Sequence, residues 1–114
     1  MRTLKFHQVI YNLDKFIGID IINNLDVTPG HYNVLFRFEG DYLTEHLTDE
    51  STPYSMDVGI GRHTMYHITE DAEIEDVVDT FVELLNEALC DDACKCVNIC
   101  EIREKAYEIV SNKN

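Results

Sequence analysis

Apolar and polar residues alternate in two stretches of the chain, and this period of two constrains the possible folds more than any other feature. The apolar positions of the first stretch are Tyr32, Val34, Phe36 and Phe38, and those of the second are Tyr54, Met56, Val58 and Ile60. Because side chains two residues apart lie on the same face of a strand, each stretch predicts a strand with one buried face.

Two turn signals extend these strands into hairpins. Gly40-Asp41 suits a two-residue turn into a strand over 42–47, and Gly61-Arg62 suits a second turn into a returning strand over 63–68. A polar loop over 48–53 separates the two hairpins. The pattern predicts a three- to four-stranded antiparallel sheet with one buried face.

The segment before this sheet has a different period. Its apolar residues recur at spacings of three and four, which predicts an amphipathic helix over roughly residues 3–23. They are Phe6, Val9, Ile10, Leu13, Phe16, Ile17 and Ile21. Gly18 weakens a helix, so a short strand over residues 16–22 remains the alternative.

Two helices are predicted to follow the sheet. The first begins at the N-cap Thr69 and has acidic residues in its first turn, where the helix dipole favours negative charge. Its apolar stripe consists of Ile74, Val77, Val78, Phe81, Leu85, Ala88 and Leu89. The second runs over about 92–110 with Asp91-Asp92 as its cap. The predicted fold is a single α+β domain over residues 1–114, with an N-terminal helix, the antiparallel sheet and two C-terminal helices packed on one sheet face.

Negative charge is concentrated in the middle of the chain. The net charge is −13, and residues 38–94 hold sixteen acidic residues and one basic residue, Arg62. Such a field repels nucleic acid and anionic membranes and speeds encounter with basic surfaces, so we expect a basic protein partner and no direct binding of nucleic acid or membrane. No apolar run approaches the ~20 residues that span a bilayer. The first residues also lack the apolar core of a signal peptide, which predicts a cytoplasmic location.

The first C-terminal helix is predicted to carry a face made only of carboxylates. Its four members, which fall within about 80° of one another on a helical wheel, are Asp76, Asp79, Glu83 and Glu87. One interpretation is the solvated face of an acidic protein, and the other is a surface that imitates nucleic-acid phosphates and meets a basic site on a partner. In the second interpretation Glu73, Asp49 and Glu50 are supporting contacts.

Four cysteines lie within eleven residues. They are Cys90, Cys94, Cys96 and Cys100, in the spacing C-x3-C-x-C-x3-C. Three interpretations stay open: small residues buried in a helix–helix contact, a zinc site made of all four thiolates, and disulfides. The spacing lacks the C-x2-C knuckles of structural zinc sites, and the neighbouring aspartates disfavour thiolate, so the prediction is no cofactor, with zinc as the alternative.

Signals for an enzyme are missing from the sequence. It contains no phosphate-binding loop, no dinucleotide-binding glycine motif and no H-E-x-x-H zinc motif. His63 and His67 share a face of the predicted returning strand, where exposed sheet residues and a histidine metal site are the two interpretations. We therefore expect a non-enzymatic protein.

In charge, size and predicted order of elements, the chain resembles small acidic inhibitor proteins as a type: phage-encoded anti-restriction and anti-CRISPR proteins, DNA mimics and bacterial toxin-immunity proteins. The resemblance covers no motif and assigns no residue. It implies an inhibitor that blocks the nucleic-acid site of an enzyme through its carboxylates. The alternatives are an immunity protein that neutralises one toxin and an adaptor module stabilised by zinc on the four cysteines.

Overall fold

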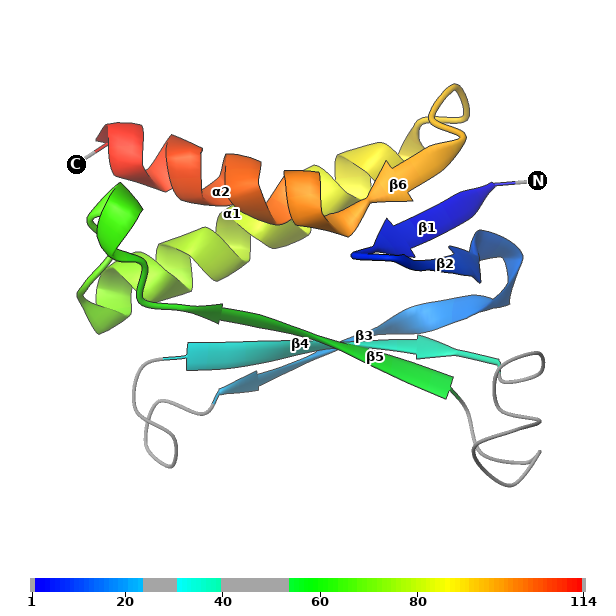
Figure 1. Cartoon of the computed structure of the whole chain (residues 1–114), viewed down its shortest axis with the longest axis horizontal. Coiled ribbons are helices and arrows are strands. Elements are labelled where there is room, and N and C mark those ends of the chain that lie inside the picture. Colours follow the sequence, from blue (N-terminus) through cyan, green and yellow to red (C-terminus); the bar gives the residue numbers. More distant parts are fainter. Residues whose placement is uncertain (1, 24–30, 40–53, 114) are drawn as a thin grey trace.

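A computed structural model of the chain describes residues 2–23, 31–39 and 54–113. The elements in chain order are β1 (Thr3–Phe6), β2 (Val9–Asn12), η1 (Leu13–Lys15), β3 (Phe16–Asn23), β4 (His31–Phe38), β5 (Tyr54–Gly61), η3 (Thr64–Tyr66), α1 (Asp71–Cys90), β6 (Cys96–Asn98) and α2 (Ile99–Lys113). The strands form two three-stranded sheets, one in the order β2-β1-β6 and one in the order β3-β4-β5. The two helices lie over one face of the β3-β4-β5 sheet, and the smaller sheet lies at the end where α1 finishes and α2 begins (Figure 1). Within the described residues, no helix is long and apolar enough to cross a membrane.

The larger sheet is antiparallel, and the sequence alternation explains which of its faces is buried. Strands β4 and β5 pair so that Val34 lies opposite Val58 and Phe36 lies opposite Met56. All four side chains are buried, whereas the intervening Asp57 is exposed. The two strands predicted from the alternation are therefore confirmed. The predicted strand over 42–47 and the loop over 48–53 lie outside the described residues.

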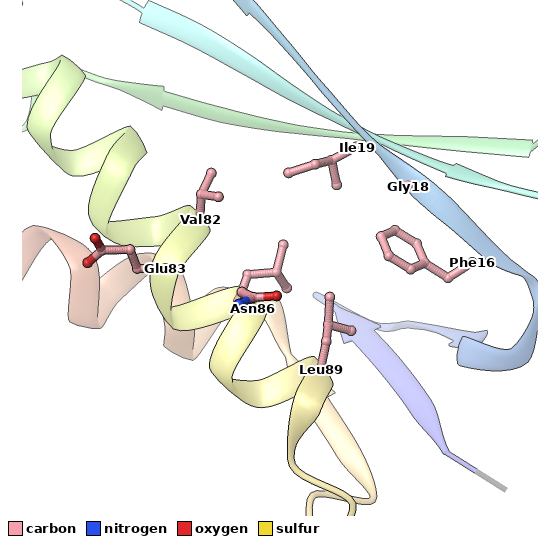
Figure 2. A pocket seen from close by; sticks show the side chains of 8 residues that line it. Phe16, Gly18, Ile19, Val82, Glu83, Asn86 and Leu89 are labelled. Atoms are coloured by element: carbon pink, nitrogen blue, oxygen red, sulfur yellow. The ribbon is translucent and has the colours of Figure 1, made fainter.

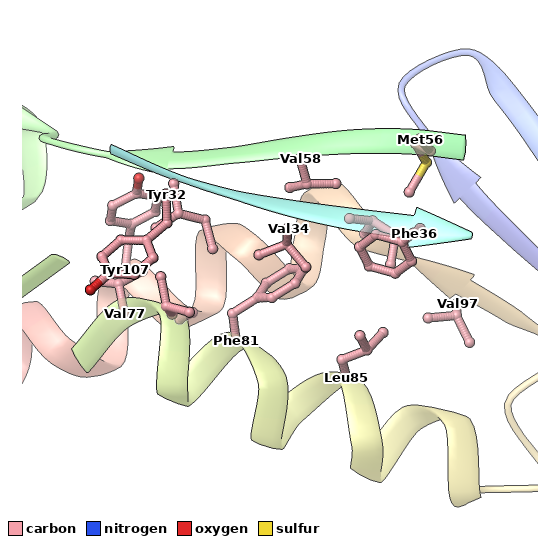
Figure 3. Packing of buried hydrophobic residues seen from close by; sticks show 14 of the residues in the cluster. Tyr32, Val34, Phe36, Met56, Val58, Val77, Phe81, Leu85, Val97 and Tyr107 are labelled. Carbon is pink, nitrogen blue, oxygen red and sulfur yellow. The ribbon is translucent and has the colours of Figure 1, made fainter. Parts of the chain in front are cut away.

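Helix α1 supplies the other half of the core. Phe81 lies against the edge of Phe36, with 6.3 Å between the ring centroids and 78° between the ring planes, which is a favourable aromatic geometry. Val77 and Leu85, one turn away on either side, continue the same buried stripe toward the sheet (Figure 3). The apolar stripe predicted for this helix is confirmed, and it fixes which side of α1 faces the solvent.

The predicted N-terminal helix is wrong, and with it the predicted architecture. Residues 3–12 form the hairpin of β1 and β2, in which Leu4 pairs with Tyr11, and residues 16–23 form β3. Apolar residues at spacings of three and four fit both a helix and a hairpin that reverses direction between them. The left-handed φ of 55° at His7 makes the reversal possible in the short turn. The isoleucine-rich segment from residue 16 favours a strand because branched side chains lose rotamer freedom in a helix.

The C-terminal region differs from the prediction at three places. The returning strand over 63–68 is instead the short helix η3, closed by one isolated bridge between His63 and Ile68. The second helix begins at Ile99, after a strand, β6, that pairs in parallel with β1. Asp91 ends α1 and its carboxylate accepts a bond from the Ala93 N–H, so it caps a turn and not the second helix. Because the predicted N-terminal helix is replaced by strands, two α-helices among the described residues, α1 and α2, cover the larger sheet (Figure 1).

One tyrosine of α2 connects that helix to the larger sheet. The Tyr107 hydroxyl donates to the Gly61 carbonyl at 2.8 Å and accepts from the Gly61 N–H at 2.9 Å. Both bonds are lost in Tyr107→Phe, which leaves two backbone groups at the end of β5 without this partner. We expect a loss of about 1–2 kcal/mol of unfolding free energy, measured by urea denaturation.

The neighbouring tyrosine provides a matched control. Tyr66 stacks on Tyr107 with 5.7 Å between ring centroids, and its hydroxyl donates to the carboxylate of Glu104 at the surface. Because that bond is exposed, Tyr66→Phe is expected to cost under about 0.5 kcal/mol. Equal losses in the two variants would contradict a special role for the Tyr107–Gly61 pair.

Candidate functional site

Helix α1 presents its carboxylates on the side opposite the core. Asp76, Asp79, Glu83 and Glu87, which we call the acidic quartet, are all exposed. The buried residues of the helix are Ile74, Val77, Val78, Phe81 and Leu85. The packing of that stripe on the sheet holds the quartet in the solvent, as the sequence predicted.

The start of α1 is fixed by a capping box that uses two further acidic residues. The side chain of Glu70 accepts from the backbone of Glu73, and the Glu73 carboxylate accepts from the Glu70 N–H at 3.0 Å. Glu70, not the predicted Thr69, is therefore the N-cap. The backbone N–H groups of Glu70 and Thr69 lower the pKa of Glu73 because they stabilise its carboxylate. Glu73 was predicted to be a supporting contact with a partner, and in the structure its carboxylate stabilises the first turn of α1.

Basic side chains offset little of this charge. Helix α1 contains seven Asp and Glu residues and no Lys or Arg. An ion pair joins Asp71 to Arg62 at 3.8 Å, and both side chains are more than half exposed. Lys105 of α2 lines the same surface hollow as Glu87, but no ion pair joins them. The quartet is thus a charged surface that no basic side chain of the described residues pairs with, and Asp49 and Glu50 lie outside the described residues.

The charge of α1 also reaches the sheet. The pKa of Tyr32 on β4 is raised, first by burial of its hydroxyl and then by the negative charges of Glu75, Asp79 and Asp71. Asp71, Glu75, Asp79 and Glu83 follow one another at spacings of four, so their carboxylates repeat about every 6 Å along the helix. Asp71 and Glu75 were not among the predicted contact residues, although their spacing of four from Asp79 was a signal for them.

A groove runs between α1 and the edge strand β3. Its volume is about 350 Å³, and its apolar walls are Phe16 and Ile19 from β3 and Val82, Leu85 and Leu89 from α1 (Figure 2). Glu83 and Asn86 supply its polar lining. One member of the acidic quartet therefore borders an apolar hollow. No sequence pattern predicted this groove, because its walls come from residues more than sixty positions apart.

The four cysteines have separate surroundings. Cys90 Sγ lies 3.8 Å from Asn86 Oδ1, Cys94 Sγ lies 3.4 Å from the Cys96 carbonyl, and Cys100 Sγ lies 3.6 Å from His7 Nδ1. None is fully buried and none forms a disulfide. The interpretation as buried residues of a helix–helix contact is wrong, because Cys90 and Cys96 are exposed and Cys94 and Cys100 are only partly buried. Within the described part of the chain, no three metal-binding side chains come together.

The described histidines belong to no group of three metal-binding side chains. The ring of His63 packs against Tyr66 and Tyr107, at 4.8 and 4.9 Å between centroids. His67 ends η3 with a left-handed φ of 57°. The hydrogen bond that the Tyr66 hydroxyl donates to Glu104 stabilises the neutral phenol, and it therefore raises the pKa of Tyr66 to about 12. This cluster fixes η3 against α2 and offers no activated nucleophile.

Comparisons of the chain with protein-family models, with curated proteins and with solved structures gave no significant match.

Proposed function

We propose that the chain is a non-enzymatic acidic binding protein that inhibits a nucleic-acid-handling enzyme by occupying its basic nucleic-acid site. The observation that carries this proposal is the acidic quartet: four exposed carboxylates, without ion pairs to described basic residues, on a helix whose opposite side is packed into the core. A site built from Lys and Arg to neutralise phosphates accepts such a row of negative charges. The proposed class is that of the anti-restriction, anti-CRISPR and DNA-mimic inhibitors encoded by phages.

The negative charge of the chain favours a protein partner over nucleic acid. The net charge of −13 repels phosphate backbones and attracts basic proteins, and like-charged neighbours on α1 destabilise the helix itself. A helix face that contains carboxylates alone has a cost of a few tenths of a kcal/mol per pair, which binding to a basic surface offsets. An inhibitor of this kind acts in the cytoplasm, that of the host cell if a phage encodes it.

The test compares two variants with the same change of net charge. In the first, the acidic quartet is converted to lysine. In the second, four exposed acidic residues from other elements are converted: Asp14, Glu39, Asp92 and Glu108. A partner is first recovered from bacterial lysate on immobilised chain, and its Kd and nucleic-acid-processing activity are then measured with each variant.

We expect the quartet variant to bind at least about tenfold more weakly, because each attractive contact becomes a repulsive one, and to lose inhibition. The control variant should stay within about threefold of the original Kd, and added salt should weaken the wild-type complex. Equal losses of affinity in both variants would show that the quartet acts only through the net charge of the chain, which would contradict the proposal. A toxin without nucleic-acid chemistry as the partner would make the chain an immunity protein.

A further inference from the structure

Strand β3 lies at one edge of the larger sheet, and apolar side chains line this edge. It pairs with β4 on one side, and no described strand pairs with it on the other. Three of its isoleucines, Ile17, Ile21 and Ile22, are 57, 47 and 44% exposed. Proteins usually protect a free edge with lysine or proline, and β3 contains neither. Its bulge between Phe16 and Gly18 protects only the first residues, so the rest of the edge is open to pairing.

The register with β4 assigns the side chains of β3 to two faces. Ile19 and Ile21 pair with buried residues of β4, so both lie on the side of the sheet that the helices cover. Gly18 and Asp20 alternate with them and therefore lie on the opposite face. On that face Gly18 pairs in register with Arg37 of β4. No described atom lies within 4 Å of the position that a Cβ of Gly18 would occupy, so there is open space beside the strand at this point.

The β3 edge carries little net charge, although the chain carries −13. Asp20 is the one charged residue of β3, and the Arg37 guanidinium donates to its carboxylate. A basic partner is attracted to the carboxylates of α1, and this neutralised apolar edge gives it no comparable attraction. Two copies of the same acidic chain repel each other, so they can meet only where their charge is locally neutralised. The edge therefore favours a second copy over a basic partner.

An antiparallel pair of β3 strands makes this edge complementary to itself. In such a pair, a two-fold axis perpendicular to the sheet places Ile19 opposite Ile19 of the second copy. Ile17 then lies opposite Ile21 of the second copy, and Gly18 lies opposite its Asp20. The arrangement avoids opposite carboxylates, which a pair centred on Asp20 would create at a cost in stability.

The glycine in this register leaves room for an ion pair between the two copies. Arg37 and Asp20 of the second copy are two strand spacings apart, roughly 10 Å between their Cα atoms, with only Gly18 between them. Because Gly18 has no side chain, the long Arg37 side chain can cross it to reach that carboxylate. Each Asp20 is then next to an arginine of its own chain and an arginine of the other.

We propose that the chain forms a two-fold dimer by antiparallel pairing of its β3 edges, which joins the two larger sheets into one sheet of six strands. The isoleucines of the two edges cover one another on the helix side, and Ile21 of the second copy lies beside the apolar groove at Phe16 and Ile19 (Figure 2). The two-fold axis keeps both α1 helices on the same side of this sheet, so the dimer presents two acidic quartets. Repulsion between them opposes the contact, and the small interface makes the dimer weak.

Sedimentation velocity over about 1–500 μM chain measures the monomer–dimer equilibrium. We expect a Kd of about 10–200 μM in about 0.15 M NaCl. The Kd should fall at least threefold in about 0.5 M NaCl, because salt screens the repulsion between the two acidic chains and leaves the apolar contact in place. A monomer at about 500 μM in both salts would overturn the inference. A dimer that salt weakens would show that ion pairs, and not the apolar edge, hold the two copies together.

Lysine substitutions test whether the isoleucines of β3 form the contact. Ile17→Lys combined with Ile21→Lys places like charges opposite each other and should raise the Kd at least tenfold. The matched control, Ile10→Lys combined with Met65→Lys, makes the same change of net charge at two apolar residues that are exposed elsewhere. It should leave the Kd within about threefold of the wild-type value. Equal losses in the two double variants would contradict pairing through β3.

A charge exchange tests the register of the two strands. Asp20→Arg and Arg37→Asp each place like charges across the contact between two identical copies, so each variant alone should raise the Kd at least tenfold. An equimolar mixture of the two variants restores both ion pairs between the copies, although each chain still lacks its internal pair. We therefore expect the mixture to form a heterodimer with a Kd within about threefold of the wild-type value, identified by its mass in native mass spectrometry. A mixture of folded variants, verified by circular dichroism, that remains monomeric would overturn the proposed pairing. The proposed function is tested separately, because loss of the dimer leaves the acidic quartet in place on α1.

Discussion

Phe81→Ala is expected to lower the free energy of unfolding by about 4 kcal/mol. Phe81 is fully buried and lies against Phe36 of β4, so its removal leaves a cavity at the centre of the contact between α1 and the sheet. The loss includes the transfer of the ring, the cavity and the aromatic contact. The melting temperature should fall by roughly 15–20 °C in a thermal scan followed by circular dichroism.

A comparison with Met65→Ala makes this prediction specific. Met65 is 80% exposed, so its truncation is expected to change stability by less than about 0.5 kcal/mol. A loss below about 1.5 kcal/mol in Phe81→Ala would contradict the packing of α1 on the larger sheet. The result also bears on function, because the same contact keeps the acidic quartet on the solvent side of the helix.

The elements that could be predicted from the sequence are those with one buried face of regular period. Tyr32, Val34, Phe36 and Phe38 on β4 recur at every second residue, and Ile74, Val77, Phe81 and Leu85 on α1 recur at spacings of three and four, so each set lines one face of its element. The same apolar stripe also predicted the exposure of the quartet, because a helix with one buried side has only one side left for its carboxylates.

The remaining elements depend on partners that are distant along the chain. The three residues of β6 are too few to show a period, and their pairing with β1 joins Thr3 to Cys96. The spacing of Phe6, Val9 and Ile10 fits a helix as well as a hairpin, and the branched residues after Phe16 decide for strands. The groove has the same origin, since Ile19 and Leu89 approach each other only when α1 crosses the sheet. The protein partner, the absence of a cofactor and the non-enzymatic character remain predictions.

Arg2→Ala is the second substitution with a large expected effect, at about 3 kcal/mol of unfolding free energy. The Arg2 guanidinium donates to four backbone carbonyls at the end of α1, those of Ala88, Leu89, Asp91 and Cys94, at 2.9–3.0 Å. The last turn of α1 has no basic residue, and Arg2 supplies positive charge to the negative end of its dipole. The bonds also join the start of β1 to the loop that precedes β6. Urea denaturation measures the loss.

Two further variants separate the geometry of this contact from its charge. Arg2→Lys keeps the positive charge but lacks the planar fork of donors, so we expect it to recover less than half of the loss. Arg62→Ala removes an exposed arginine with a hydrogen bond to the Thr69 carbonyl and an exposed ion pair with Asp71, and should cost under about 1 kcal/mol. Wild-type stability in Arg2→Lys would show that charge alone is sufficient, and equal losses in Arg2→Ala and Arg62→Ala would contradict the four-bond contact. Hydrogen exchange should also accelerate most at the end of α1, because its carbonyls are the groups that lose their partner.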